Sequence, residues 1–173
     1  VGDFSDGNDN VVLKGKKTLP EIKGQAVNLV ELSVSLYLLA GGLDSVGLAE
    51  SDISVVNTSD ADMVAAFATK DVTAAVTWNP LLGEILGMPN SYKVFDSSQI
   101  PGEIIDLLVI NTKVLADNPA LGKALVGAWY EIMGIMQGSG AAAVAARTAM
   151  GQASGTDLAG YEAQMLNTAM FFT

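Results

Sequence analysis

One segment of the sequence places polar side chains where an expected strand turns into an expected helix. Glu31 ends the strand, and Ser33, Val34 and Ser35 open the helix. Free N–H groups in the first helical turn, here near Val34 and Ser35, can hold polar atoms of a ligand. The Glu31 carboxylate could accept paired hydrogen bonds from a planar cation. Ser33 or Ser35 could instead be only the N-cap of the helix.

Trp78 ends a second expected strand and is followed by Asn79. The Trp78 indole either packs beneath the next helix or forms a flat platform, over which a cation gains about 0.5–2 kcal/mol. Asn79 is expected to cap that helix, with Pro80 in its first turn. A further carboxylate, Asp106, breaks an apolar run and lies either on an exposed strand face or in a binding site. We expect Glu31, Trp78 and Asp106 to meet at one sheet edge. The predicted ligand-binding residues are Glu31, Ser33, Val34, Ser35, Trp78, Asn79 and Asp106.

Two missing residue types exclude several kinds of catalytic site. The chain has no His and no Cys, so it cannot by itself form a Ser-His-Asp or Cys-His arrangement. Zinc sites and haem held by His are excluded with them. The acidic segment 3–9 does not space Gly and Glu as an EF-hand loop requires. We therefore expect no catalytic residue, no metal and no cofactor. An enzyme that works through carboxylates alone, such as Glu31 with Asp106, is the alternative.

The composition is that of an acidic, apolar, folded chain. Of 173 residues, 50% are hydrophobic and 16% are charged, which is too apolar for intrinsic disorder. Nine Lys and Arg face nineteen Asp and Glu, for a formal net charge of −10. Such a chain repels phosphate backbones, so nucleic acid is excluded as a partner. No run of about 18 apolar residues occurs, so no stable membrane insertion is expected. The polar N-terminus lacks a signal peptide and an initiating Met, as in a mature protein or a piece of one.

Alternating strand and helix signals position these side chains. Short apolar strand candidates alternate with amphipathic segments of helical spacing. Strands are expected at 25–31, 53–57, 72–78 and 92–95. This order predicts an α/β fold with a three-layer, mostly parallel sheet, in which ligands bind at the carboxyl ends of the strands. Helices are expected over 118–137, 141–150 and 156–167. Residues 1–10 are interpreted as an exposed loop and 14–23 as a solvated turn region.

Several motifs occur in an order that resembles one family of binding proteins. They are DFSDGND (3–9), LKGKKTLPEIKGQ (13–25), LVELSVSLYLLA (29–40), VVNTSDADMVAAF (55–67), AAVTWNPLLGEI (74–85), VFDSSQIPGEIIDLLVINTKVLADNP (94–119) and ALGKALVGAWYEIM (120–133). Together they resemble the nitrate/sulfonate/taurine-type periplasmic substrate-binding proteins of ABC importers, most closely the branch encoded beside urea carboxylase. The resemblance covers nearly the whole chain.

The resemblance implies a type II periplasmic-binding-protein fold, with two α/β lobes joined by two crossings. It assigns residues 1–10 to the first interlobe crossing and 11–100 to the second lobe. Residues 101–110 would be the return crossing, and 111–173 a helical part of the first lobe. The remainder of that first lobe would then be missing, which indicates a fragment. The hinge residues expected in the crossings are Ser5, Gly7, Asn8, Pro101 and Gly102.

Three positions depart from the family's pattern. Relatives often carry His at position 36 and Arg or another large residue near 41–42, where this chain has Leu36, Gly41 and Gly42. Two glycines within a helix cost about 1 kcal/mol each relative to Ala. If residue 36 contributes to the ligand site, a polar contact is lost here, so these positions bear on ligand affinity.

The resemblance implies capture of a small solute and its delivery to an ABC permease in the inner membrane, with no chemistry on the solute. The expected location is the periplasm, or the outside of the cell on a membrane anchor. No Lys or Arg falls in the proposed ligand-binding segments, whereas Glu31 and Asp106 do. A cationic or polar neutral ligand, urea- or guanidine-like, therefore matches better than an anion. The alternatives are a sulfonate- or nitrate-type anion, and an effector-sensing domain of a transcription regulator with the same two-lobe architecture.

Overall fold

The computed structural model describes residues 2–170, which belong to two compact units. The first, here called the sheet unit, is residues 5–104. The second, here called the helical unit, combines residues 2–4 with 105–170. Val1, which begins the predicted first crossing, and residues 171–173, which end the predicted first-lobe segment, lie outside the described residues. Each unit is considered by itself below.

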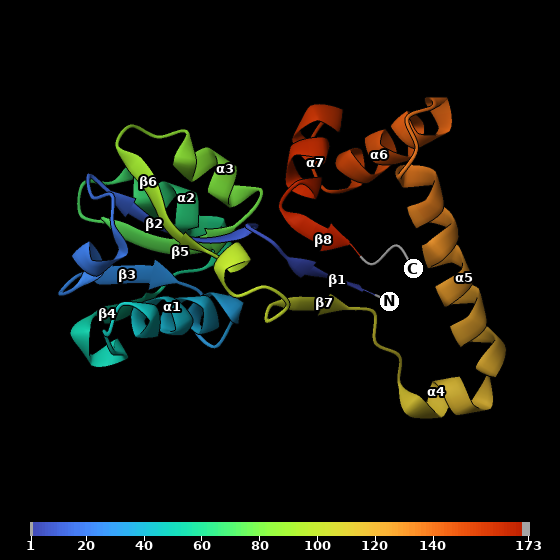
Figure 1. The fold of residues 1–173 in the computed structure, drawn as a ribbon, viewed down its shortest axis with the longest axis horizontal. Helices are drawn as coiled ribbons and strands as arrows, with labels where there is room; N and C mark the ends of the chain where they lie inside the picture. The colour runs from blue at the N-terminus through green and yellow to red at the C-terminus, as the bar shows by residue number, and fades with distance from the viewer. Residues whose placement is uncertain (1, 171–173) are drawn as a thin grey trace. The chain divides into compact units, whose positions relative to one another are not determined.

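The sheet unit is built on a five-stranded sheet in the order β4-β3-β5-β2-β6 (Figure 1). Strand β3 is parallel to β4 and β5, whereas β2 runs antiparallel to β5 and β6. Four of the five strands therefore point the same way, which confirms the predicted α/β fold with a mostly parallel sheet. The strands are β2 (Asp9–Lys14), β3 (Ala26–Leu29), β4 (Ser54–Asn57), β5 (Ala74–Trp78) and β6 (Ser91–Asp96).

Strand β2 corrects the sequence interpretation of the N-terminal region. Residues 1–10 are expected to be a loop and 14–23 a turn, but β2 runs through Asp9–Lys14 between β5 and β6. Its three apolar residues, Val11, Val12 and Leu13, are completely buried. The segment is short and opens with Asp and Asn, which locally favour turns. Pairing on both sides and burial on both faces outweigh that preference, as is usual for strands.

Helices cover both faces of this sheet, so that the unit has three layers, with the sheet in the middle. Helix α1 (Val34–Ser45) packs on one face, where Leu38, Leu39 and Leu43 join β-strand residues in the larger apolar core. Helices α2 (Asp60–Ala68) and α3 (Leu81–Leu86) pack on the other, around Phe67 and Val12. Short 3-10 turns, η1 (Leu19–Ile22), η2 (Glu50–Asp52) and η3 (Ser97–Gln99), complete the unit.

Two of the three helix positions singled out in the sequence analysis, Leu36 and Gly42, have packing roles. A Cβ atom on Gly42 would lie 3.1 Å from the Phe95 ring, so this glycine allows α1 to approach β6 closely. Leu36 is partly buried and packs against the larger core. Gly41 is less constrained, since the nearest atom, from Ile100, lies 4.0 Å from its Cβ position.

The helical unit carries four helices and a small sheet. The helices are α4 (Thr112–Asp117), α5 (Pro119–Met136), α6 (Ala141–Ala153) and α7 (Leu158–Met165). The last three agree with the helices predicted from periodicity and from the Asn118-Pro119 start signal. The sheet has the order β7-β1-β8, with β1 (Gly2–Ser5), β7 (Ile105–Leu107) and β8 (Thr168–Met170). Strands β1 and β7 are antiparallel. Among residues 2–170, no helix has both the length and the apolar character needed to cross a membrane.

Candidate functional site

The carboxyl edge of the five-stranded sheet is where the candidate site lies. We use "carboxyl edge" for the ends of β3, β4, β5 and β6 together with the start of the antiparallel β2. In open α/β sheets, ligands bind at this edge. The buried polar or charged residues of the described chain all lie on strands, turns or helix starts that reach this edge: Ser5, Asp9, Asn10, Asn28, Ser35, Thr58, Thr77, Asp96 and Ser97. Such a concentration of polar groups at one end of an apolar core is typical of a binding site.

The turn from β3 into α1 forms one side of this edge. Ser33 is the N-cap, since its Oγ accepts a hydrogen bond from the Ser35 N–H at 3.1 Å and donates to the Val30 carbonyl at 2.7 Å. Ser35 is completely buried, and its Oγ has no hydrogen-bond partner among the described residues. Capping therefore accounts for Ser33, whereas the Ser35 hydroxyl keeps its bonding capacity unused. The Val34 side chain is exposed.

Glu31 lies on the exposed surface of the same turn. Its N–H donates to Asn57 Oδ1 at 3.1 Å, which connects the turn to the end of β4. The next residue, Leu32, is 96% exposed and has φ of +57°. A left-handed conformation is uncommon for a residue with a branched apolar side chain. The turn is thus held in a specific shape that leaves the Glu31 carboxylate exposed to solvent.

Trp78 lies at the end of β5, opposite Asp9 in the β2–β5 register. Its ring is half-buried, so both predicted roles, packing and a platform, are compatible with its position. Asn79 corrects a prediction: α3 begins at Leu81, and no side chain caps it. The Asn79 amide instead donates to Asn8 Oδ1 at 3.1 Å, which joins the end of β5 to the turn before β2.

Beneath these residues lies a buried hydrogen-bonded cluster that the sequence did not reveal. Ser5 Oγ donates to Asp9 Oδ2 at 2.5 Å and lies 2.6 Å from Ser97 Oγ. The Gly7 N–H donates to Ser97 Oγ at 2.8 Å. The cluster joins segments about ninety residues apart in the sequence, so no local motif signals it. It fixes the turn between β1 and β2 against the end of β6.

Two further buried groups face each other across β2 and β5. Asn10 and Thr77 are register partners and are completely buried. The Asn10 amide donates to the Gly7 carbonyl at 2.8 Å. Asn10 Oδ1 and Thr77 Oγ1 have no hydrogen-bond partner among the described residues. Leaving buried polar atoms unpaired is costly, about 1–3 kcal/mol each, so such groups favour a site that a polar molecule completes.

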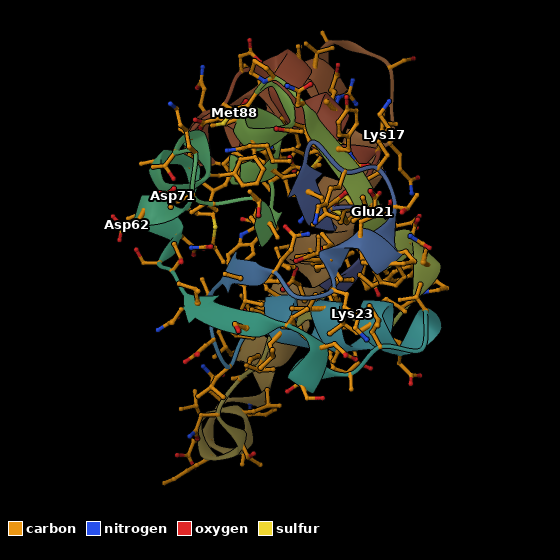
Figure 2. The ribbon with its side chains drawn as sticks, turned by 90° about the vertical axis from the view of Figure 1, so that its left-hand side faces the viewer. Lys17, Glu21, Lys23, Asp62, Asp71 and Met88 are labelled. Atoms are coloured by element: carbon orange, nitrogen blue, oxygen red, sulfur yellow. The ribbon has the colours of Figure 1, made fainter. Side chains whose placement is uncertain are left out.

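The charges of the sheet unit are distributed unevenly between its two edges. Lysines gather at the amino ends of the parallel strands, where Lys14 ends β2, Lys23 precedes β3 and Lys70 precedes β5. Figure 2 shows Lys17, Glu21 and Lys23 in this part of the unit. Most of these lysines are engaged there: Lys23 pairs with Asp52 at 3.0 Å, Lys16 donates to the Glu21 carbonyl at 2.9 Å, and Lys14 donates to the Phe67 and Thr69 carbonyls.

The carboxyl edge, by contrast, carries carboxylates. Asp9 begins β2, Glu31 lies on the turn after β3, and Asp96 ends β6. The one lysine on a nearby strand, Lys93, is bound to Asp96 at 2.7 Å. Burial by itself would raise the pKa of Asp96, but hydrogen bonds from Lys93 and Ser98 outweigh it, so that the pKa lies below its ordinary value. Asp96 therefore stays ionised, and Lys93 is occupied in neutralising it.

The predicted hinge residues lie beside the boundaries of the sheet unit. These boundaries fall between residues 4 and 5 and between 104 and 105. Ser5 and Gly7 belong to the Ser97 cluster, and Asn8 receives the hydrogen bond from Asn79. The Ser5 N–H also donates to the Ile104 carbonyl at 2.9 Å, so the two crossings are paired to each other where the unit ends.

Pro101 and Gly102 lie in an exposed turn, where Gly102 has φ of +77°. The next residue, Glu103, accepts a hydrogen bond from Tyr37 Oη of α1 at 2.6 Å. This bond raises the pKa of the Tyr37 hydroxyl. Movement of these residues stays a prediction.

Asp106 is not at the carboxyl edge of the five-stranded sheet. It lies on β7 of the separate three-stranded sheet, exposed and opposite Asp3 of β1. The expectation that Asp106 shares a sheet edge with Glu31 and Trp78 is therefore wrong. Burial, and then repulsion from Asp106, raises the pKa of Asp3. Asp106 is best understood through this cross-strand pair of carboxylates.

Comparison of the sequence with models of protein families shows the family to which this chain belongs. The model of the NMT1-like family matches residues 14–150. The chain belongs to the NMT1-like family. Among individual members, it is 26% identical over 123 residues to a protein of Brucella abortus (strain 2308) that is named as a binding protein, and the match covers 69% of this chain and 39% of that one. A similarly named protein of Brucella suis biovar 1 (strain 1330) matches to the same extent. This NMT1-like chain thus spans about two fifths of the length of these relatives.

Solved structures show the fold to which this NMT1-like chain is similar. The alkanesulfonate-binding protein SsuA of Xanthomonas axonopodis pv. citri, bound to MOPS, matches with a TM-score of 0.76 and 17% identity. The match covers 98% of this chain and 60% of that one. The periplasmic aliphatic sulphonate binding protein SsuA of Escherichia coli matches with a TM-score of 0.75 and 18% identity, over 96% and 57% of the two chains. The chain therefore has the fold of part of a periplasmic binding protein.

Proposed function

We propose that this chain is part of the solute-binding component of an ABC importer. In the periplasm, that component would capture a small polar or cationic nitrogen compound and deliver it to a permease in the inner membrane. Membership of the NMT1-like family and the shared fold with sulfonate-binding proteins support the binding role. The residues at the carboxyl edge support the ligand class, a urea- or guanidine-like molecule. We also infer that the chain belongs to the branch encoded beside urea carboxylase, which the neighbouring genes would test.

The observation that carries the ligand class is that no free lysine lies at the carboxyl edge of the sheet unit. Its lysines lie at the amino ends of the parallel strands, except for Lys93, which forms a salt bridge with Asp96. Within this unit, an anion at the carboxyl edge would face Asp9 and Glu31 with no free lysine to balance it. Bringing an anion close to a carboxylate in a partly desolvated site, with no cation to balance them, costs free energy of binding. A cation or a neutral hydrogen-bond donor is favoured there instead.

Glu31 and Trp78 are the residues proposed to hold this ligand. A planar guanidinium can donate two parallel hydrogen bonds to a carboxylate, and Glu31 presents one to solvent. A half-buried indole such as that of Trp78 can stack on the same planar group. The first turn of α1, through the Val34 N–H and the buried Ser35 hydroxyl, is proposed to contact a polar acceptor on the ligand, such as the oxygen of urea. Asn79 is proposed to line the site beside Trp78.

A sulfonate- or nitrate-type anion is the second candidate. Two observations favour it. The first turn of α1, whose partial positive charge suits anions, begins at the same edge. The solved relatives named above are sulfonate-binding proteins. The exposed Glu31, directly before that turn, opposes an anion, and this opposition makes the two candidates separable by experiment.

Calorimetric titration of the natural full-length polypeptide with urea, methylguanidine, nitrate and ethanesulfonate tests the proposal. We expect saturable heat with urea or methylguanidine and none with the two anions. Saturable binding of nitrate or ethanesulfonate, without binding of either nitrogen compound, would overturn the proposed ligand class while leaving the binding role intact. Recovery of a chemically altered nitrogen compound after incubation would overturn the carrier role itself.

A further inference from the structure

Leu32 has two unfavourable properties that the packing of the sheet unit does not explain. Its side chain is almost fully exposed, and its backbone has φ of +57°. The other described residues with positive φ are six glycines and Asn90, which are the residue types that adopt this conformation most readily. A leucine there is disfavoured by its Cβ atom and gains nothing from burial within the unit. Such a combination points to a role other than packing.

Leu166 of the helical unit shows that exposure alone is not the unusual feature. It is 83% exposed, but its backbone is helical, with φ of −71°. Single exposed leucines of that kind are common on protein surfaces. Leu32 differs because glycine or asparagine would adopt the same turn with less strain. The leucine side chain at this position is therefore the feature to be explained.

The turn that carries Leu32 is fixed by hydrogen bonds on both sides of it. Ser33 Oγ donates to the Val30 carbonyl at 2.7 Å, which closes the turn across Leu32. The Glu31 N–H donates to Asn57 Oδ1 at 3.1 Å, which connects the turn to the end of β4. Leu32 is thus presented at a defined position, directly after a residue with an exposed carboxylate.

Two further exposed apolar side chains follow in the first turn of α1. Val34 and Tyr37 are three residues apart, so they lie on the same face of the helix. The Tyr37 hydroxyl donates to Glu103 at 2.6 Å, which holds the ring in place. Residues 31–37 therefore present one carboxylate followed by exposed apolar groups. Such a surface matches a ligand that has a cationic head and an alkyl substituent.

We propose that Leu32 is a specificity-determining residue of the ligand site, one that contacts an alkyl substituent on the bound nitrogen compound. The inference rests on the proposed function and narrows its ligand class to N-alkylated guanidines or ureas. Glu31 binds the planar nitrogen group, and Leu32 and Val34 cover the alkyl chain. Each methylene group buried in this way strengthens binding about fourfold. The turn keeps a strained leucine because glycine or asparagine would lack this contact.

Calorimetric titration of the natural full-length polypeptide with guanidine and with butylguanidine tests the inference. In the wild type, we expect butylguanidine to bind at least about tenfold more tightly than guanidine. In Leu32→Asn, which introduces a residue type suited to positive φ, that ratio should fall below about threefold. Equal affinities of the wild type for the two compounds, or an unchanged ratio in Leu32→Asn, would overturn the inference while leaving the proposed function intact. Absence of binding of both compounds would overturn the proposed function as well.

Leu166→Asn is the matched control, because it replaces another exposed leucine by the same residue. The ratio of the two affinities should stay at its wild-type value in this variant, and an equal fall in both variants would contradict a contact at Leu32. Thermal unfolding separates ligand contact from packing. The melting temperature of Leu32→Asn should equal or exceed that of the wild type, because strain at φ of +57° is reduced. A melting temperature several degrees lower would assign Leu32 to packing within the polypeptide and overturn the inference.

Discussion

The sheet unit and the helical unit differ most in where each keeps its polar and apolar groups. The sheet unit encloses two apolar clusters, one on each face of its sheet, and collects its buried polar residues at the carboxyl edge. The helical unit exposes apolar faces on α5 and α6 and places a pair of carboxylates, Asp3 and Asp106, across two strands. The first arrangement is a closed apolar core with buried polar groups at one edge, and the second leaves apolar faces of two helices exposed.

The largest effect that this difference predicts is on stability. Phe67 is completely buried in the sheet unit, so Phe67→Ala should lower the free energy of unfolding by about 3–5 kcal/mol. Leu166 of the helical unit is 83% exposed, so Leu166→Ala should change it by less than about 0.5 kcal/mol. Urea denaturation of each variant measures both values. A comparable loss in the two variants would mean that the helical unit has a core of its own.

The second-largest effect is expected on ligand binding at the carboxyl edge. Removing the charge of Glu31 by Glu31→Gln should weaken methylguanidine binding about ten- to hundredfold, because hydrogen bonds to charged groups contribute about 1.5–3 kcal/mol. Glu50→Gln is the matched control, since Glu50 is exposed on η2, before β4 begins. Calorimetric titration gives both affinities. An unchanged affinity in Glu31→Gln would remove Glu31 from the site.

A smaller loss of stability is expected from the buried cluster. Ser97→Ala leaves Ser5 Oγ and the Gly7 N–H without their shared partner, at a cost of about 1–3 kcal/mol. Gln99→Ala, an exposed substitution in the same turn, serves as control. Thermal unfolding distinguishes the variants. If Ser97→Ala and Gln99→Ala melt together, the cluster does not hold this edge.

Two carboxylates, Asp96 of the sheet unit and Asp3 of the helical unit, should contribute to the pH dependence of stability in opposite directions. The pKa of Asp96 is lowered on folding, so its contribution to stability is present above the unfolded value of 3.8 and is lost as the pH falls through the folded pKa. The pKa of Asp3 is raised, so the folded state binds its proton more tightly, and stability falls as the pH rises from 3.8 through the folded pKa.

The free energy of unfolding of Asp96→Asn should therefore fall less steeply in acid than that of the wild type. Asp3→Asn should raise the free energy of unfolding slightly at neutral pH. Denaturation curves between pH 3 and pH 7 measure both slopes. An Asp3→Asn variant that is less stable than the wild type at pH 7 would contradict the assignment of Asp3.

Local signals predicted most of the architecture. The start signal Asn118-Pro119 and the helical periodicity after it located α5, and the alternation of strands and helices between residues 25 and 95 predicted the mostly parallel sheet. Strand β2 was missed because its turn-forming first residues mask a central strand whose burial depends on its two neighbours. Whether such a segment forms a strand or a turn is determined by its tertiary pairing rather than by its local propensity.

The candidate site was less predictable than the fold. The strand-end position of Glu31 and Trp78 could be inferred, since both follow apolar strand candidates. Asp106 could not be assigned to its sheet, because an apolar run does not specify which strands it joins. The cluster of Ser5, Asp9 and Ser97 is formed by segments far apart in the sequence. No local sequence pattern around these short polar residues predicts such a long-range contact.

The two tryptophans of the chain provide the most direct test of the central claim, because Trp78 lies in the sheet unit and Trp129 in the helical unit. Nuclear magnetic resonance of their indole N–H groups, assigned with Trp78→Phe and Trp129→Phe, would follow a titration with methylguanidine. The indole signal of Trp78 should shift saturably while that of Trp129 stays unchanged, and ethanesulfonate should shift neither. A saturable shift of Trp78 with ethanesulfonate alone, or of Trp129 with methylguanidine alone, would contradict a nitrogen-ligand site at the carboxyl edge.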